Sequence, residues 1–380
     1  MFSINYQRMN DYPDLERVWR DLESRSQKSV FLSWSWIKHM SSCDESNINV
    51  LSVNYQSKVI GLCLFKIKDT KIANIIKVKQ CYLNRHGVDK LDQIWIEYND
   101  FLVDLSMEKA VKTAMLEYFF SNQLADEVIL GMSDLKTSND IISNNILGTN
   151  SRVIIQSSGF IADLRSSSSL EEYLSTLSKN TRSQIKRSHR LLKQLGTIEL
   201  IEAESVNEKL EFFNQAGKIH SERWENTEFG TGFSNPSFVN FHYNLISEVA
   251  QHNVTKIFKL SLNNHALAYI YLLIEDEKWL FYLSAIKFHS DNRIKIGLLF
   301  HSLIIEKAIE SRIHFYDFLA GTARYKQSLS NIERYEQQLI CYYKNTLTLR
   351  VVNQCRLFKL KLKAVFSTFN KNHPQIQVEQ

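Results

Sequence analysis

Glycine and proline are scarce in this sequence, with 11 and 3 residues among 380. Neither a G-x-x-x-x-G-K-[ST] nor a G-x-G-x-x-G pattern occurs, which excludes phosphate cradles of the P-loop and Rossmann kinds at the level of the motif. No stretch approaches the roughly 18 uncharged apolar residues that a membrane-spanning helix needs. The N-terminus also lacks the apolar core, flanked by basic residues, of a signal peptide.

Cysteine is present five times, an odd number, and no two cysteines have a C-x-x-C spacing. This usage disfavours both a disulfide framework and a zinc site, so we expect no metal. A reducing, cytoplasmic compartment fits the sequence best.

The formal net charge of +5 is small for the length, and it is concentrated in two places. One basic run extends from Lys179 to Lys193, and a second lies near the end, with Arg350, Arg356, Lys359, Lys361 and Lys363. Local patches of this kind indicate anionic partners at those places. They do not indicate a general nucleic-acid surface, and we expect no specific nucleic-acid partner.

The length is comfortable for two domains, and a hydrophobic fraction of 44% provides ample material for buried cores. A serine-rich stretch at Arg165–Ser169 interrupts the apolar periodicity and offers N-caps for a helix at 170–177. We therefore place a junction there. The predicted parts are an N-terminal domain at 1–165, a C-terminal domain at 166–345 and a basic amphipathic tail at 346–380.

Apolar spacing in the first part predicts an alternation of helices and strands. Helices are expected at 13–22, 31–40 and 108–122. Strands are expected at 49–54 and 59–66, which read as a hairpin, and at 72–78, 94–103, 127–131 and 152–156.

The second part predicts a strand at 197–201 and two helices at 206–224 and 237–251. Three strands follow at 256–262, 266–274 and 279–284, the first two joined by a tight turn at Asn263-Asn264. A helix at 297–310 and strands at 314–319 and 338–343 complete the order. This is an α/β pattern, with a meander followed by a crossover helix.

That order resembles the GNAT acyltransferase core, and four short motifs strengthen the resemblance. Tyr316-Asp-Phe-Leu-Ala-Gly321 followed by Tyr325-Lys326 looks like the YDFL-x-G…YK signature of the CelD/BcsL-like acetyltransferases, relatives of the Fem transferases in bacterial polysaccharide gene clusters. Phe31–Trp36 is similar to the family's F-x-S-x-x-W motif, 169–196 to the start of its second domain, and His220–Trp224 to its R-W helix end.

The resemblance implies tandem GNAT-like domains of the Fem type, with mixed central sheets flanked by helices. The first domain would face the acceptor, and the second would bind acyl-CoA, with acetyl-CoA as the leading donor. The inserted helical arm of the tRNA-dependent Fem enzymes is missing from 179–195, which favours acyl-CoA over aminoacyl-tRNA.

The donor site implied by the resemblance lies where the chain enters the helix at 297–310. A helix N-terminus binds anions through its free N–H groups, here those of Ile296, Gly297 and Leu298. Gly297 would allow close approach of a diphosphate, and Arg293 and Lys295 could supply charge. The family often has Pro-Gly at this point, where this chain has Ile-Gly. Alternatively, Gly297 only eases the start of a buried helix, and both cations face solvent.

Three residues are candidates for catalysis. Asp317 lies in the middle of an apolar strand, so it needs a partner; it could accept the acceptor's proton, or it could pin the following loop. Lys326 could stabilise the oxyanion that forms when the thioester carbonyl is attacked, or it could be an exposed lysine. His220 could act as a base, although a lone histidine is more often structural.

Four further residues are candidates for substrate binding. Arg223 beside Trp224 could clamp a planar or anionic group, or Trp224 could belong to the core while Arg223 caps its helix. Tyr282 faces either the acyl chain or the core. Tyr325 joins this group through the signature motif.

The two basic runs leave alternatives open. The helix at 181–195 could meet a nucleotide-sugar or lipid diphosphate, or it could present a solvated face. The tail could pack on the domain, or it could contact the inner face of an anionic membrane peripherally.

The sequence thus predicts an N- or O-acyltransferase in which an amine or hydroxyl of a sugar or cell-envelope or polysaccharide precursor attacks the thioester directly. One alternative is a Fem-like transferase that depends on aminoacyl-tRNA, which would require many phosphate contacts. The other is a non-catalytic GNAT-shaped scaffold in a polysaccharide synthesis complex.

Overall fold

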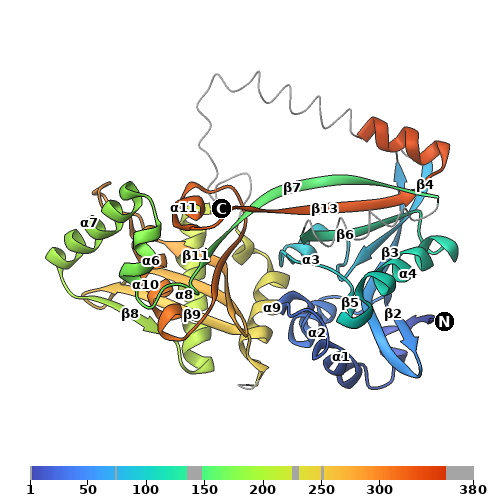
Figure 1. The fold of residues 1–380 in the computed structure, drawn as a ribbon, viewed down its shortest axis with the longest axis horizontal. Helices are drawn as coiled ribbons and strands as arrows, with labels where there is room; N and C mark the ends of the chain where they lie inside the picture. The colour runs from blue at the N-terminus through green and yellow to red at the C-terminus, as the bar shows by residue number, and fades with distance from the viewer. Residues whose placement is uncertain (1, 73–74, 135–147, 225–230, 250–251, 357–380) are drawn as a thin grey trace.

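The protein has two halves that share one continuous sheet (Figure 1). The computed structural model describes residues 2–72, 75–134, 148–224, 231–249 and 252–356. Within these ranges the strand order is β1-β2-β3-β4-β6-β13-β7-β12-β11-β10-β9-β8, and β5 pairs with β3. The long strands β7 (Thr149–Asp163) and β13 (Tyr335–Lys344) pair antiparallel and run from one half to the other.

The first half contains the strands β1 (Ser3–Arg8), β2 (Ile48–Tyr55), β3 (Lys58–Ile72), β4 (Ile76–Leu83), β5 (Leu102–Val103) and β6 (Glu127–Asp134). Its helices are α1 (Leu15–Glu23), α2 (Trp34–Ser42), α3 (Asp89–Asp92) and α4 (Glu108–Ser121). The predicted hairpin is confirmed: β2 and β3 pair antiparallel through Gln56 and Ser57, both with positive φ.

The predicted strand at 94–103 is wrong except for Leu102–Val103. Residues 94–101 form an irregular segment instead. The apolar residues at both ends of this stretch favoured a strand, but those at 94–96 pack against the second half of the protein rather than on one face of a sheet. Ile94 and Ile96, for example, belong to a core cluster that includes Phe241 and Leu283.

The second half follows the predicted order. Its helices are α6 (Leu170–Thr176), α7 (Lys179–Leu195), α8 (Val206–Trp224), α9 (Pro236–Ile246), α10 (Ile296–Glu310) and α11 (Arg324–Leu329). Its strands are β8 (Ile198–Glu202), β9 (Thr255–Leu262), β10 (His265–Glu275), β11 (Lys278–Ile286) and β12 (Phe315–Ala320). The tight turn at Asn263-Asn264 is confirmed, because both residues have positive φ between β9 and β10.

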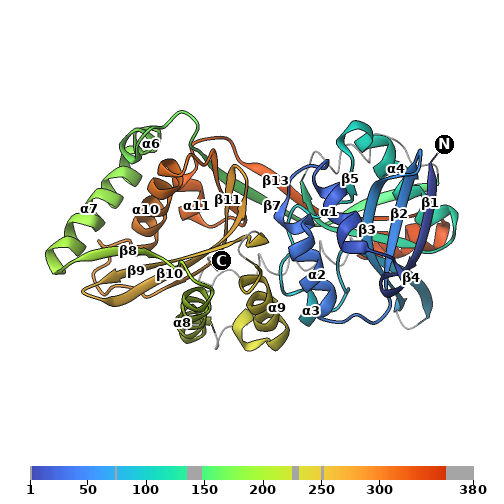
Figure 2. The ribbon, with the colours of Figure 1, turned by 90° about the horizontal axis from the view of Figure 1, so that it is seen from below.

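Helices cover both faces of the second-half sheet (Figure 2). Helices α6, α7 and α10 lie on one face and share a core with β9–β12, whereas α8 and α9 lie on the other. The core beneath α8 and α9 also contains side chains of α1 and α2 from the first half. Trp36 of α2, from the F-x-S-x-x-W motif, contacts Phe241 of α9 with ring centroids 4.7 Å apart. The two halves are therefore packed against each other through large aromatic side chains.

Strands β11 and β12 separate after a short parallel pairing. They pair only at Lys278↔Phe315, Trp279↔Tyr316 and Leu280↔Asp317, although β11 continues to Ile286. On its other side β12 has a register shift between Asp317 and Ala320, where Leu319 has a φ of 59°. A bulge of this kind bends a strand away from its neighbour. The β11 edge beyond Leu280 is thus left open.

Part of the predicted C-terminal tail lies within the described residues. Residues 347–356 are helical, and Leu349 packs with Val78 and Tyr343 at the far end of the first half. Residues 357–380, which carry most of the predicted amphipathic pattern, lie outside the described part. No helix in the described part of the chain has both the length and the apolarity to cross a bilayer.

Candidate functional site

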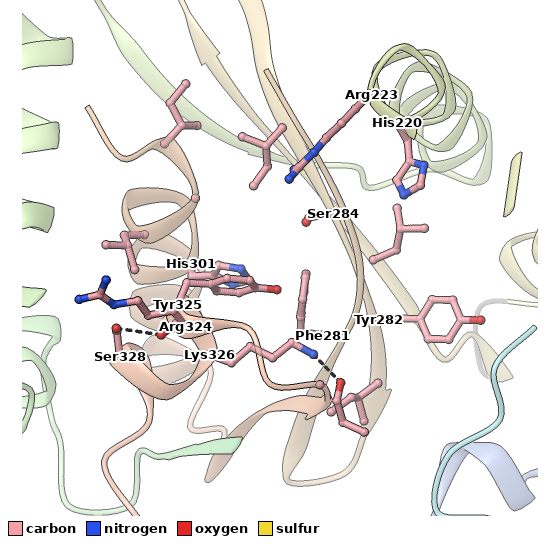
Figure 3. Close-up of a pocket in the computed structure, with 18 of the residues that line it drawn as sticks. His220, Arg223, Phe281, Tyr282, Ser284, His301, Arg324, Tyr325, Lys326 and Ser328 are labelled. Atoms are coloured by element: carbon pink, nitrogen blue, oxygen red, sulfur yellow. Dashed lines mark hydrogen bonds between the residues drawn. The ribbon is translucent and has the colours of Figure 1, made fainter. Parts of the chain in front are cut away.

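A cavity of about 1230 Å³ opens where β11 and β12 part (Figure 3). It is bounded by α7, α8, α10 and α11 of the second half. Residues of the first half between Asp92, at the end of α3, and Glu97 close it, together with Met132 on β6. Ile155 and Leu339 on the shared strands β7 and β13 complete the wall. The cavity is therefore built by both halves of the chain.

The N-terminus of α10 forms one end of the cavity. No side chain caps this helix, and its first intrahelical bond runs from Leu299 N to Lys295 O at 3.1 Å. The N–H groups of Ile296, Gly297 and Leu298 precede that bond, and all three residues line the cavity. Free N–H groups at a helix start, with the helix dipole behind them, favour an anion.

Basic side chains surround this helix start. Arg293 lines the cavity, but its guanidinium is paired with Asp291 at 2.7 Å. Lys295 is held through its backbone N–H, which donates to Ser188 Oγ of α7 at 2.8 Å. Arg187, one residue earlier on α7, also lines the cavity, and its Nε is buried with no hydrogen-bond partner among the described residues. One face of the basic helix is thus turned to the cavity rather than to solvent.

Asp317 is fully buried and does not line the cavity. Its carboxylate accepts hydrogen bonds from Tyr98 Oη at 2.6 Å, Tyr335 Oη at 2.9 Å and Leu319 N at 2.8 Å. The last of these fixes the positive-φ residue of the bulge. The arrangement matches the interpretation in which Asp317 pins the loop that follows it.

Lys326 is buried and lines the cavity. Its Nζ donates to the Ala320 carbonyl at 2.6 Å, the bond drawn in Figure 3. Gly321 has a φ of 127°, and a Cβ there would lie 2.9 Å from Lys326 Nζ. Burial lowers the pKa of Lys326, and the charges of Glu97 and Asp317 oppose that shift. The aspartate, glycine and lysine of the signature motif therefore hold one backbone turn, residues 319–321, at the strand opening.

Glu97 is a cavity residue that the sequence did not single out. Its Oε2 accepts hydrogen bonds from Ala320 N at 2.9 Å and from Gln337 Nε2 at 2.7 Å. Burial raises the pKa of Glu97 to about 7, against the hydrogen bond from Ala320 and the charge of Lys326. The one signal in the sequence was the polar stretch Glu97-Tyr-Asn-Asp100, which interrupts the apolar residues of 94–103.

His220 and Arg223 extend from α8 toward the cavity (Figure 3). His220 Nδ1 lies 2.8 Å from Thr231 Oγ1. The Arg223 guanidinium lies 4.6 Å from the ring centroids of both Trp224 and Phe288, between two elements that flank the cavity mouth. These cation–π contacts hold the planar guanidinium of Arg223 against the two aromatic rings at the cavity mouth.

Tyr282 and Tyr325 lie on different sides of the opening. The Tyr282 ring packs on Trp36, and its hydroxyl donates to the Ile94 carbonyl, away from the cavity centre in Figure 3. Tyr325 stacks on His301 with centroids 5.3 Å apart, inside the cavity wall. Tyr282 thus anchors the segment that bears Glu97, and Tyr325 lies beside Lys326.

His220 is expected to stay neutral at physiological pH. Burial, with a smaller contribution from Arg223, lowers its pKa to about 4, so the unfolded chain binds more protons between that value and the ordinary pKa near 6.5. Acidification through this window should therefore destabilise the fold. A histidine NMR titration should show no His220 transition above about pH 5.5, and a transition near 6.5 would contradict this environment.

The described residues contain no group of three or more His, Cys, Asp or Glu side chains placed to hold a metal ion.

Comparison with known proteins identifies the type of domain. Residues 179–327, from the start of α7 into α11, match the family model described as an acetyltransferase (GNAT) domain. The fold is that of the GNAT acyltransferases. Because this domain contains the cavity's helix start and the whole signature motif, the protein is an acyltransferase.

Several solved structures share the fold over nearly the whole chain. A structure described as FemX has a TM-score of 0.59 at 13% identity and covers 91% of this chain and 99% of its own. L-PGS from Bacillus licheniformis has a TM-score of 0.53 at 11% identity, covering 92% and 99%. A conserved protein of unknown function from Bacteroides thetaiotaomicron has a TM-score of 0.54 at 11% identity, covering 90% and 100%. No curated protein matches the sequence.

These likenesses confirm the predicted fold class, an α/β fold of the Fem type with mixed sheet and flanking helices. At identities of 11–13% these are likenesses of fold alone, and they identify neither the donor nor the acceptor.

Proposed function

We propose that the protein transfers an acyl group from acyl-CoA, with acetyl-CoA as the first candidate, to an amine or hydroxyl of a sugar or cell-envelope or polysaccharide precursor. The observation that carries this proposal is a single cavity that joins three features. They are the uncapped start of α10, the open edge of β11, and the buried turn held by Glu97 and Lys326.

The donor fits the second-half side of the cavity. Its diphosphate suits the N–H groups of residues 296–298, with the unpartnered Arg187 Nε as a further donor. Its pantetheine arm is an extended chain with amides. The β11 edge beyond Leu280 offers backbone groups that β12 no longer pairs with, as an added strand requires. The thioester would then lie near the turn at 319–321.

The acceptor fits the opposite side, where the first half closes the cavity. Arg223 and Trp224 flank the mouth, and Met132, Ile155 and Leu339 form an apolar wall. We therefore assign the acceptor to the side of the cavity that the first part of the chain, 1–165, closes, where the second part adds Arg223, Trp224 and Leu339, and we assign the donor to 166–345. This assignment makes the two parts complementary sides of one site, working in the cytoplasm or at the inner face of the membrane.

In this proposal Lys326 and Asp317 have different roles. Lys326 lines the cavity and can stabilise negative charge that develops on the attacked carbonyl oxygen. Asp317 has all three of its bonds directed to the protein and shapes the turn instead. His220, with its pKa at about 4, is a weak base and is better suited to positioning.

An aminoacyl-tRNA donor is the second candidate, because the chain resembles the Fem transferases, some of which depend on tRNA, and a structure described as FemX shares the fold. Helix α7 is a single helix of 17 residues, with no helical arm added to it. A gel shift with bulk tRNA at moderate salt, set against titration with acetyl-CoA, separates the two donors. Binding of tRNA but not of acetyl-CoA would favour this second function.

Gly297→Val is the direct test of the donor site. A Cβ at this position would already lie 3.3 Å from Ile286 Cδ1, so the branched side chain should cover the N–H groups of the helix start. We expect acetyl-CoA to bind about tenfold more weakly or worse, measured by calorimetric titration. Glu310→Gln, at the exposed far end of the same helix, should leave the affinity unchanged.

The same titration distinguishes an enzyme from a scaffold that has lost donor binding. Acetyl-CoA at 100 times its Kd should stabilise the wild-type protein by about 2.7 kcal/mol. Absence of any thermal shift at millimolar acetyl-CoA would favour the scaffold. Equal affinity of wild-type and Gly297→Val protein would place the donor elsewhere in the cavity.

A further inference from the structure

The first half contributes the ionisable side chains of Arg85, Asp92 and Glu97 to the cavity wall. Glu97 lies on the irregular segment between α3 and β5, and it contacts the turn that the signature motif holds. This segment is fixed from both sides. Tyr282 of β11 bonds the Ile94 carbonyl, and Tyr98 bonds the buried Asp317. Glu97 is therefore placed by the docking of the two halves, and not by its own half alone.

The two carboxylate oxygens of Glu97 differ in their hydrogen bonding. Oε2 accepts both hydrogen bonds, from Ala320 N and Gln337 Nε2. Oε1 accepts none from the described residues, and Glu97 lines the cavity. One oxygen is thus anchored while the other remains available to a proton on a bound molecule.

Gln337 can hydrogen-bond to Glu97 whether Glu97 is ionised or protonated. Its side chain is fully buried on β13, and its Oε1 has no donor among the described residues. With its Nε2 toward Glu97 it stabilises the carboxylate. After rotation of the amide, its Oε1 would accept from the protonated carboxyl. An amide can serve both protonation states, whereas a lysine or arginine in this place would serve only one.

The groups that surround Glu97 shift its pKa in opposite directions. Burial and the negative charge of Asp317 on β12 raise its pKa, whereas Lys326 on α11 and the two hydrogen bonds lower it. Tyr335 on β13 and Tyr282 on β11 also face it, and burial raises the pKa of both, so they remain neutral. The outcome is a carboxyl that titrates at about 7. A base with a pKa near the working pH is the most effective one.

We propose that Glu97 is the residue that takes the proton from the acceptor during acyl transfer, which makes the site catalytic only when both halves are present. This inference rests on the proposed function. As the acceptor's oxygen or nitrogen forms a bond to the thioester carbonyl carbon, its proton passes to Glu97 Oε1. The C–S bond then breaks, and Glu97 returns the proton to the leaving sulfur, directly or through water. The products are the acylated acceptor and a free thiol, and Glu97 ends unchanged.

Asp317, the acid that the signature motif suggests, cannot fill this role. Two tyrosine hydroxyls and a backbone N–H occupy its oxygens, and it does not line the cavity. Asp92 lines the cavity, but it binds the backbone N–H groups of His86 and Gly87. Among the carboxylates of the described cavity wall, Glu97 alone combines an available oxygen with contact to the signature turn.

The test compares Glu97→Gln with Glu336→Gln in the full-length protein. Glu336 lies one residue before Gln337, bonds Ser158 Oγ at 2.9 Å and does not line the cavity. Thiol release from acetyl-CoA is measured with water and then with glucosamine as acceptor, and acetyl-CoA affinity is measured by titration. Infrared difference spectra of the free protein across about pH 5.5–8.5 report the protonated carboxyl independently of turnover.

In wild type and Glu336→Gln we expect an acid limb of kcat/KM near pH 7 and a carboxyl band that disappears over the same range. Glu97→Gln should lose the band and the acid limb, and its turnover should fall by about 100-fold or more. Its acetyl-CoA affinity should stay within about threefold of wild type, because the donor's diphosphate binds elsewhere.

The two ways of failing are distinct. A wild-type protein that binds and turns over acetyl-CoA, with Glu97→Gln equally active or with its acid limb intact, overturns the assignment of Glu97 and leaves the function standing. An infrared spectrum without a titrating carboxyl band also overturns the assignment. A wild-type protein that binds no acetyl-CoA overturns the proposed function, and this inference with it.

Discussion

Lys326→Met should reduce turnover by about 100-fold or more while acetyl-CoA affinity stays within about threefold. Methionine preserves the length and the apolar stem of the side chain, so the change removes the charge and the bond to the Ala320 carbonyl. In the proposed binding mode the donor's diphosphate lies at the other end of the cavity, at the start of α10. The loss should therefore fall on the chemical step, and steady-state kinetics combined with titration of acetyl-CoA separates the two effects.

The pH profile of Lys326→Met provides a second measurement. The positive charge of Lys326 lowers the pKa of Glu97, so removal of that charge should raise this pKa and move the acid limb of kcat/KM to higher pH. Lys307→Met, on the exposed side of α10 where Lys307 pairs with Glu310, is the matched control and should behave as wild type. Undiminished turnover in Lys326→Met would remove this lysine from the mechanism.

Asp317→Asn should lower the free energy of unfolding by about 2–4 kcal/mol. Asparagine has the same shape, but its amide nitrogen cannot accept a hydrogen bond. At least one of the three buried donors, from Tyr98, Tyr335 and Leu319, therefore loses its acceptor. Urea denaturation measures the loss.

A surface aspartate provides the comparison for this variant. Asp69→Asn, at an exposed position of β3, should change the free energy of unfolding by no more than about 0.5 kcal/mol. If Asp317→Asn proved as stable as Asp69→Asn, the network around the bulge would not hold the turn as described.

The signature motif was recognised from the sequence, but the role of each of its residues became clear only from the structure. Tyr316–Gly321 with Tyr325-Lys326 suggested a catalytic strand and loop from resemblance. In the structure Asp317, Gly321 and Lys326 each serve the same turn: one pins Leu319, one permits a φ of 127°, and one bonds Ala320. The turn that the motif forms lies at the wall of the cavity. The individual roles depend on directions that a linear pattern does not contain.

At the start of α10, too, the sequence predicted the helix but not the side chains that lie around it. The start of α10 was predicted to within one residue, at 297 against the observed Ile296, because the apolar helical pattern begins there. Arg187 was seen only as one cation in a basic run. Its place on the cavity wall, with a buried Nε, follows from the packing of α7 beside α10, where Ser188 receives the Lys295 N–H. No spacing in the sequence relates these two helices.

Local patterning in the sequence determined the order of the strands and long helices in the second half, the hairpin of β2 and β3, the tight turn at 263–264, and the GNAT type of the second half. Each of these depends on residues close together in the chain, where periodicity and turn chemistry act. Only the tertiary structure decided that an irregular segment would carry Glu97 to a turn 223 residues away, at Ala320. The same is true of Gly159, whose bare backbone leaves room for the Tyr335 ring beside Asp317. Contacts over such separations come from the packing of the two halves against each other, and no local rule of sequence encodes them.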